Sequence, residues 1–364
     1  MSLNVGIIGL PNVGKSTIFN VLTKAQNAEC ANYPFCTIDS NKAIVPVPDQ
    51  RVDKLAELVE PENAACATVT FIDIAGLVKG ASGGAGLGNQ FLGRIREVDA
   101  LLHVVRCFND ENVAHVEAEL DPVRDIQVVN TELILADLQS LEKKIASLEK
   151  NVRNDKDLKP LLEIAHDFSE WLDSGQPLAT HAQVRNEAAV QLRQEVHFLT
   201  DKPVIYCANV NEDELTGDSS LVKAVESYAA ENHAECVTIC GQLEAELLDL
   251  APQEQLDFLK SYGLPESGLN RIVHTAFKAL RLQSFFTAQP AEVRAWTFRA
   301  GCTAPQAAGL IHTDFEKGFI RAKVVSFEDF VKYGSLTAAR EAGVMRTEGK
   351  DYEVRDGDVI EFQI

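Results

Sequence analysis

Residues 9–16 (GLPNVGKS) constrain this chain more than any other segment, because they fit the pattern G-x-x-x-x-G-K-[ST]. The apolar residues 3–9 predict a short buried strand before this loop, and the apolar spacing of residues 17–24 predicts a helix after it. A strand, a glycine loop and a helix in this order direct backbone N–H groups and a helix N-terminus at one point, where phosphate oxygens bind. The chain is therefore predicted to bind a nucleoside triphosphate.

Each residue type in the loop has a predicted task. Gly9 and Gly14 let the backbone curl, so that successive N–H groups, including that of Val13, point inward. Lys15 is expected to reach the β- and γ-phosphates, which makes it a candidate catalytic residue as well as a binding residue. The Ser16 hydroxyl is expected to ligate Mg²⁺. The loop thus predicts nucleotide hydrolysis with magnesium as the cofactor.

A second phosphate element, residues 73–76 (DIAG), lies at the end of a predicted strand. The Asp73 carboxylate is expected to hold a magnesium-bound water, and the Gly76 N–H to meet the γ-phosphate. The glycine-rich residues 79–88 are the candidate for a segment that the γ-phosphate orders. Thr37 is a candidate for completing the magnesium shell, although an ordinary exposed turn explains this residue equally well.

Apolar strand-like runs alternate with helical segments along most of the chain. After the loop these runs cover residues 68–74, 100–107, 203–208 and 236–240. Strands that alternate with helices predict an α/β fold whose mainly parallel sheet is covered by helices on both faces.

Residues 126–199 interrupt this alternation. Apolar residues recur at four-three spacing over residues 134–148 and again over residues 189–199, and a further amphipathic stretch, residues 158–172, lies between them. The pattern predicts an inserted helical unit, either a helical hairpin or a short antiparallel coiled coil. Such an insertion is tolerated when its two ends lie close together.

The last part of the chain predicts a small mixed α/β module. We expect strands over residues 293–298 and 318–325, short helices over residues 304–310 and 336–342, and a hairpin over residues 352–362 that turns at Asp356-Gly357. Three domains are therefore predicted. A phosphate-loop nucleotide-binding domain consists of residues 1–125 together with residues 200–280, an inserted helical coiled-coil domain covers residues 126–199, and the C-terminal module covers residues 281–364.

Charge and cysteine content restrict the classes of function. The formal net charge of −20 argues against indiscriminate binding of nucleic acid, because phosphates are repelled on average. The eight cysteines form no C-x-x-C pair and no metal-finger spacing, which predicts buried free thiols in a reducing compartment. The sequence shows no secretory leader and no 18-residue apolar span. We expect a cytoplasmic protein that does not enter a membrane, and a monomer.

Four segments together resemble the YchF family of Obg-like ATPases, within the translation-factor class of phosphate-loop GTPases: residues 9–16, 32–38, 73–82 and 88–91. The inserted helical unit matches the same family. The C-terminal module resembles the TGS domain, a β-grasp (ubiquitin-like) fold, that this family carries. The resemblance therefore covers essentially the whole chain.

The resemblance implies roles for further residues. Thr17 matches a phosphate or magnesium contact beside Lys15 and Ser16, and Thr37 matches a switch element at the metal, as does Asp73. Asn12 matches a loop asparagine that helps to hold K⁺ in potassium-stimulated relatives. Stabilisation of the loop alone is the alternative for Asn12, and a comparison of turnover in potassium and sodium separates the two.

Base recognition is where this chain departs from ordinary GTPases, which carry N-K-x-D after the fourth strand. Here residues 209–212 read N-V-N-E. The Asp of N-K-x-D accepts two donors from guanine, whereas adenine presents one amino donor beside a ring acceptor, which suits an amide. The resembled family carries N-x-x-E and prefers ATP. We predict ATP, with GTP as the closest alternative, and a base contacted by Asn209, Val210, Glu212 and Gly241.

The catalytic step is predicted to be slow. Many GTPases place a Gln after D-x-x-G to orient the attacking water, and this chain has Leu77 there, which forms no hydrogen bond. A bound K⁺, a partner or His115 is a candidate for that task. A surface histidine with no catalytic role is an equally good interpretation of His115.

Basic and aromatic residues in the C-terminal module suggest a partner surface. This cluster consists of Lys317, Arg321, Lys323, Lys332 and Tyr333. It suits an RNA backbone, although lysines that protect an edge strand are a commoner explanation. The family resemblance favours RNA and the large ribosomal subunit, and hence a ribosome-associated ATPase switch. A small-molecule kinase and a nucleotide-dependent binding scaffold with negligible hydrolysis are the other two hypotheses. The kinase is disfavoured because the chain has D-x-x-G and N-x-x-E in place of an arginine-rich lid.

Overall fold

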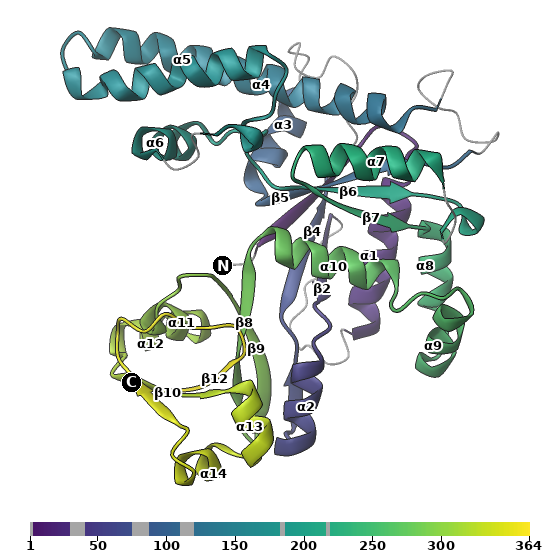
Figure 1. Ribbon diagram of the computed structural model, residues 1–364, viewed down its shortest axis with the longest axis vertical. Helices are drawn as coiled ribbons and strands as arrows, with labels where there is room; N and C mark the ends of the chain where they lie inside the picture. Colours follow the sequence, from purple (N-terminus) through teal and green to yellow (C-terminus); the bar gives the residue numbers. More distant parts are fainter. Residues whose placement is uncertain (1–2, 30–40, 75–86, 110–119, 183–185, 216–218) are drawn as a thin grey trace.

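Two six-stranded sheets and a projecting pair of helices make up the molecule (Figure 1). The computed structural model describes residues 3–29, 41–74, 87–109, 120–182, 186–215 and 219–364. In Figure 1 the first sheet lies at the centre, the helical pair extends from its upper edge, and the sheet that contains the C-terminus lies below.

The first sheet is the predicted α/β unit. Its strand order is β2-β4-β1-β5-β6-β7, and all neighbours are parallel except β2 and β4. The strands are β2 (Lys42–Pro46), β4 (Thr68–Asp73), β1 (Asn4–Ile8), β5 (Ala100–Arg106), β6 (Val204–Asn209) and β7 (Glu235–Ile239). Every residue of β5 is buried, as expected for a central strand that is covered on both faces. The prediction of a mainly parallel sheet is confirmed.

Helices cover both faces of this sheet (Figure 1). They are α1 (Lys15–Glu29), α3 (Leu87–Glu97), α7 (Ser220–Glu231) and α10 (Gly268–Ala279). Helix α8 (Gly241–Leu247) packs on α1, and α9 (Pro252–Ser261) follows it at the edge of the unit (Figure 1). The predicted helix over residues 17–24 is the middle of α1, which starts two residues earlier, directly within the glycine loop.

The helical insertion consists of α4 (Pro122–Asn151), α5 (Lys159–Asp173) and α6 (Glu187–Val196). Asp121 begins α4 as an N-cap that accepts a hydrogen bond from the Arg124 N–H, and Pro122 stands in the first turn. A separate apolar core, which includes Leu141 and Phe168, holds the three helices together. We expected residues 134–148 and 189–199 to pair, with residues 158–172 between them. The structure instead pairs α4 with α5 as a helical hairpin, because only a short connection separates these two amphipathic helices.

The second sheet has the strand order β11-β10-β12-β8-β9-β3. Its strands are β11 (Arg346–Glu348), β10 (Arg321–Ser326), β12 (Asp358–Gln363), β8 (Leu282–Ala288), β9 (Glu292–Arg299) and β3 (Asn63–Ala65). Four short helices accompany it: α11 (Ala304–Ile311), α12 (Thr313–Gly318), α13 (Phe327–Tyr333) and α14 (Leu336–Glu341). The predicted strand over residues 318–325 starts later than expected, because α12 continues to Gly318.

The predicted hairpin over residues 352–362 is wrong. A turn does occur at Asp356-Gly357, and Gly357 has a φ of 87°. However, β12 pairs with β10 antiparallel and with β8 parallel, instead of with the residues before the turn. The Asp356 carboxylate accepts a hydrogen bond from the Ser284 N–H at 2.8 Å, which directs the turn toward β8.

The N-terminal part of the chain contributes to the second sheet. Strand β3 pairs in parallel with β9, and α2 (Gln50–Val59) lies beside β8 and β9, below β2 (Figure 1). On α2, the Arg51 guanidinium donates to Asp356 at 2.7 Å and lies 4.9 Å from the ring centre of Phe286. The second sheet is thus joined to residues that we assigned to the first domain, and the proposed domain boundaries stay predictions.

Candidate nucleotide-binding site

The glycine loop connects the end of β1 to the start of α1 with a backbone that requires its glycines. Gly9 has a φ of 148°, and a Cβ there would lie 2.4 Å from the Val104 carbonyl oxygen. Gly14 has a φ of 99°, and a Cβ there would lie 2.1 Å from the Asn209 amide nitrogen. Both the left-handed conformation and the close approach exclude a side chain. The two glycines that the pattern specifies therefore serve the geometry of the loop.

Lys15 is buried beneath this loop, with 9% of its surface exposed. Its Nζ donates to the carbonyl oxygens of Gly9 at 3.0 Å and Leu10 at 2.6 Å. Burial lowers the pKa of Lys15 to about 8, and the nearby Asp73 carboxylate opposes part of that shift. The loop holds a cation that neutral carbonyl groups solvate, so a negatively charged ligand would stabilise it strongly.

Asp73 lies next to the loop because its strand β4 pairs with β1, in register Ile7 to Asp73. Burial raises the pKa of this carboxyl, while Lys15 and Arg94 lower it. Ser16 is exposed in the first turn of α1, directly after the buried lysine. A hydroxyl and a carboxylate are hard oxygen ligands, and Mg²⁺ needs only one or two protein oxygens when phosphates supply the rest. Ser16 and Asp73 fit a magnesium ion on these grounds.

His103 is a part of this region that the sequence analysis missed. It lies on β5, beside Ile8 of β1, with 2% of its surface exposed. Its Nδ1 has no hydrogen-bond partner among the residues that the structure describes. Burial lowers the pKa of His103 to about 3, and the positive charge of Lys15 lowers it further. A single histidine within the apolar residues 100–107 was the only available signal in the sequence.

Asn209 connects the predicted base-binding segments to the glycine loop. Its amide Nδ2 donates to the Val13 carbonyl oxygen at 3.0 Å, and its Oδ1 accepts from the Gly241 N–H at 3.3 Å. Val210 follows and is also buried, with its N–H donating to the Ile239 carbonyl oxygen at 2.9 Å. The ends of β6 and β7 are thereby fixed against the loop.

The predicted site residues divide into three groups. The structure brings most of them together at the carboxyl ends of the parallel strands: Asn12, Val13, Gly14, Lys15, Ser16, Thr17, Asp73, Asn209, Val210 and Gly241. Glu212 lies at the edge of this group, in a short 3₁₀ helix (Glu212–Glu214), where its carboxylate accepts a hydrogen bond from Tyr262. The third group, Thr37, Gly76 and His115, lies outside the described residues.

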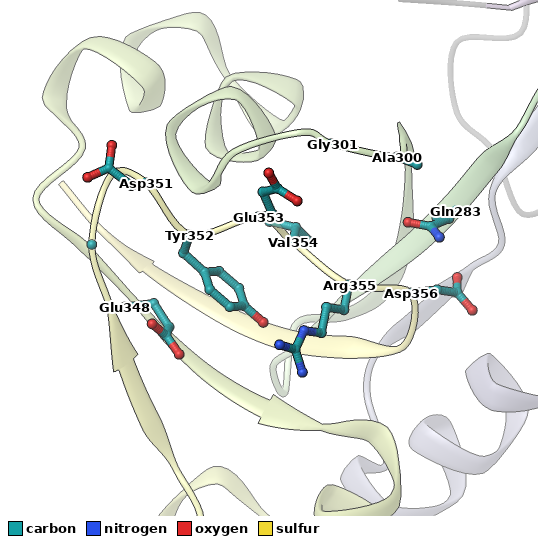
Figure 2. A pocket seen from close by; sticks show the side chains of 11 residues that line it. Gln283, Ala300, Gly301, Glu348, Asp351, Tyr352, Glu353, Val354, Arg355 and Asp356 are labelled. Carbon is teal, nitrogen blue, oxygen red and sulfur yellow. The ribbon is translucent and has the colours of Figure 1, made fainter.

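A large cavity lies elsewhere, in the C-terminal sheet (Figure 2). Its volume is about 760 Å³, and its lining includes Gln283 of β8, Glu348, Gly349 and residues 351–356. The lining has four carboxylates and one cation, Arg355, and two of the carboxylates, Asp356 and Glu348, are paired with Arg51 and Arg346. This lining offers phosphate groups no surplus of positive charge. Its lining includes neither the glycine loop nor Lys15, so we do not assign the triphosphate to this cavity.

The sheet, the loop and the helix that follows it define the class: a phosphate-loop protein with the α/β fold of GTPases. A family model described as a 50S ribosome-binding GTPase matches residues 4–157. A second model, named YchF-GTPase_C and described as a protein of unknown function (DUF933), matches residues 282–364. The chain belongs to the YchF family, as the following similarities show.

Relatives match over essentially their whole length. A ribosome-binding ATPase YchF from Escherichia coli O157:H7 is 50% identical over 364 residues, covering 100% of this chain and 99% of that protein. A protein of the same name from Bacillus subtilis (strain 168) is 48% identical over 367 residues, with the same coverage. The structure of the Schizosaccharomyces pombe YchF GTPase aligns with a TM-score of 0.89 at 36% identity, covering 100% of this chain and 98% of that one. The resemblance inferred from the motifs is confirmed.

None of the helices within the described residues is long and apolar enough to span a membrane.

Proposed function

We propose that this chain is a ribosome-associated ATPase that binds ATP with Mg²⁺ in the glycine loop and hydrolyses it slowly. The observation that carries the proposal is Lys15, a buried cation whose hydrogen-bond acceptors are the neutral carbonyl oxygens of Gly9 and Leu10. A triphosphate supplies negative charge where these acceptors carry none. The names of the bacterial relatives, which include both ATPase activity and ribosome binding, support the same assignment.

In this proposal each loop residue has a defined part. The N–H groups of Val13 and Gly14 and the start of α1 bind the phosphates, and Lys15 Nζ turns from the loop carbonyls toward the β- and γ-phosphates. Ser16 and Asp73 would hold Mg²⁺, which neutralises phosphate charge when it is bound. Thr17 and Gly241 lie together at one side of the site. A Cβ added to Gly241 would lie 3.2 Å from the methyl carbon of Thr17.

Slow hydrolysis follows from Leu77, which cannot orient a water molecule. We propose that His115, together with Thr37 and Gly76 around the γ-phosphate, completes the site when ATP is bound. We also propose that Asn12 holds a K⁺ ion that contributes to hydrolysis. Asn12 has a φ of 62° in the glycine loop. His115→Ala is expected to lower turnover and leave ATP affinity unchanged, and equal rates in KCl and NaCl would exclude the potassium ion.

The ribosome-binding surface is proposed to include the C-terminal cluster of basic residues. Lys317, Arg321 and Lys332 are exposed. Lys323 is compensated by Glu361 at 3.1 Å, so it contributes less to RNA binding than its position in the sequence suggests. We propose contact with RNA of the large subunit by a monomeric, cytoplasmic protein.

The experiment that tests the function measures ATP turnover with and without purified large ribosomal subunits, together with co-sedimentation. We expect slow turnover alone, faster turnover with subunits, and ATP-dependent co-sedimentation. Tight ATP binding without hydrolysis under both conditions would instead identify a nucleotide-dependent binding scaffold. A preference for GTP in a competition assay would identify the GTPase alternative.

A further inference from the structure

Tyr262 lies beside Glu212 of the predicted base-binding segments. It caps the C-terminus of α9, and its backbone N–H donates to the carbonyl oxygens of Phe258 at 3.3 Å and Leu259 at 3.2 Å. Its ring packs against that of Phe258 with centroids 5.0 Å apart. Both rings pack on an apolar cluster that contains Cys240 and Leu243. The Tyr262 ring is therefore anchored on the core of the nucleotide-binding unit, and its hydroxyl forms its hydrogen bond at the surface.

This hydroxyl donates a hydrogen bond to Oε1 of Glu212. Glu212 follows Asn209 by three residues, and Asn209 contacts both the glycine loop and Gly241. Burial raises the pKa of Cys240, the residue just before Gly241, and the Glu212 charge adds to that rise. The hydrogen bond to Glu212 raises the pKa of Tyr262, so this residue is a donor at neutral pH. Before any base binds, Glu212 Oε1 therefore already accepts one hydrogen bond, while no protein donor to Oε2 is observed among the described residues.

The number of acceptors that remain distinguishes the purine bases. Guanine presents two donors on its Watson–Crick edge, the N1–H and the 2-amino group, and a carboxylate with two available oxygens accepts both. Adenine presents one donor, the 6-amino group, next to the N1 acceptor. Adenine needs only one carboxylate oxygen, whereas guanine needs both and has to share Oε1 with the Tyr262 hydroxyl, which weakens that contact.

We propose that Tyr262 determines base choice in this chain, because its hydroxyl occupies Glu212 Oε1 and leaves Glu212 Oε2 as the acceptor for the adenine amino group. Tyr262 is a positioning residue in this account, since it acts on the base through Glu212. The inference rests on the proposed function, because it requires that the glycine loop binds ATP.

The test replaces Tyr262 with Phe, which removes the hydroxyl and keeps the ring against Phe258. Dissociation constants of Mg·ATP and Mg·GTP are measured by calorimetry for the full chain. We expect the ratio of the GTP to the ATP dissociation constant to fall about tenfold, mainly because GTP binds more tightly. Tyr228→Phe is the matched control, because the Tyr228 hydroxyl on α7 accepts a hydrogen bond from Asn130 on α4 at 3.2 Å. The ratio of dissociation constants is expected to stay unchanged in this variant.

A double-mutant comparison separates this role from a general effect on folding. In a Glu212→Gln background, Tyr262→Phe is expected to have no further effect on the ratio, because the amide introduced by that substitution does not provide the pair of carboxylate oxygens. If Tyr262→Phe keeps the wild-type ratio and the wild-type melting temperature, the inference is wrong and the proposed function stands. If the wild-type chain binds neither nucleotide, or if it prefers GTP, the proposed function and the inference are both wrong.

Discussion

Two buried charged residues occupy different kinds of environment in this protein. Lys15 lies beneath the glycine loop, where Gly9, Asn12 and Gly14 all have positive φ angles. Asp137 lies on α4 at the base of the helical insertion, with 1% of its surface exposed. Asp137 accepts three hydrogen bonds, from the Leu199 and Thr200 N–H groups at 2.9 Å each and from the Thr200 hydroxyl at 2.8 Å.

The difference shows which of the two regions is arranged for a ligand. Burial raises the pKa of Asp137 to about 6, although three donors oppose the shift, and all of those donors belong to the protein. Asp137 therefore fastens α4 to the segment that returns to β6. The Lys15 ammonium group donates to neutral carbonyl oxygens and lies next to strained backbone, and a triphosphate would stabilise this arrangement. We expect mutation of Lys15 to affect ATP binding and mutation of Asp137 to affect stability.

Replacement of Lys15 by Met is the change with the largest expected effect on binding. Because Lys15 is expected to contact two phosphates through charge-assisted hydrogen bonds, ATP affinity should fall at least about 100-fold, as measured by calorimetry. The melting temperature without nucleotide should stay equal or rise, since the mutation removes a buried cation. Lys24→Met is the control on the same helix: Lys24 is exposed and pairs with Asp249 at 2.9 Å, and its loss should change neither quantity. A large loss of stability in Lys15→Met would contradict the comparison.

Replacement of Asp137 by Ala should have the opposite pattern. Three buried donors lose their acceptor, so the free energy of unfolding should fall by about 3 kcal/mol. ATP affinity should remain within about twofold of the wild-type value, because Asp137 has no part in the glycine loop. Urea unfolding and calorimetry measure the two quantities, with the exposed Glu142→Ala on the same helix as the control. If Asp137→Ala weakens ATP binding as strongly as it weakens the fold, the two regions are coupled and the comparison fails.

Local sequence patterns were sufficient for the parts of the structure that depend on neighbouring residues. The glycine loop, the strands that follow it and the long helices were predicted because a motif or an apolar period specifies each of them. The cluster of Lys15, Asp73 and Asn209 was also predictable, because the carboxyl ends of parallel strands meet at one edge of a sheet.

Contacts between distant parts of the chain were not predictable in this way. The pairing of β3 with β9 and the hydrogen bond of Asp356 to Ser284, which redirects the predicted hairpin, join segments that share no local pattern. Tyr262 was missed for the same reason, because its contact with Glu212 spans 50 residues. His103 was hidden in an apolar strand. The roles of Thr37, Gly76 and His115 remain predictions, since they lie outside the described residues.

The smallest predicted effect is a proton that Lys15 takes up when ATP binds. With a pKa of about 8, Lys15 is half protonated at pH 8 in the nucleotide-free protein. The phosphates stabilise the charged form and raise this pKa, so binding at pH 8 should take up about half a proton. By the same linkage, ATP affinity should decrease as the pH rises through 8, because the bound state carries more protons than the free one.

Calorimetry at pH 8 in two buffers with different ionisation enthalpies measures this uptake directly. The observed binding enthalpies should differ between the buffers at pH 8 and coincide at about pH 6.5, where Lys15 is almost fully protonated before binding. The Tyr262→Phe variant serves as a control, because it alters contacts of the base and should show the same uptake. Equal enthalpies in both buffers at pH 8 would mean that Lys15 is already charged in the free protein. The loop carbonyls of Gly9 and Leu10 would then be sufficient to solvate the charge, and Lys15 would resemble Asp137 in having its contacts completed by the protein.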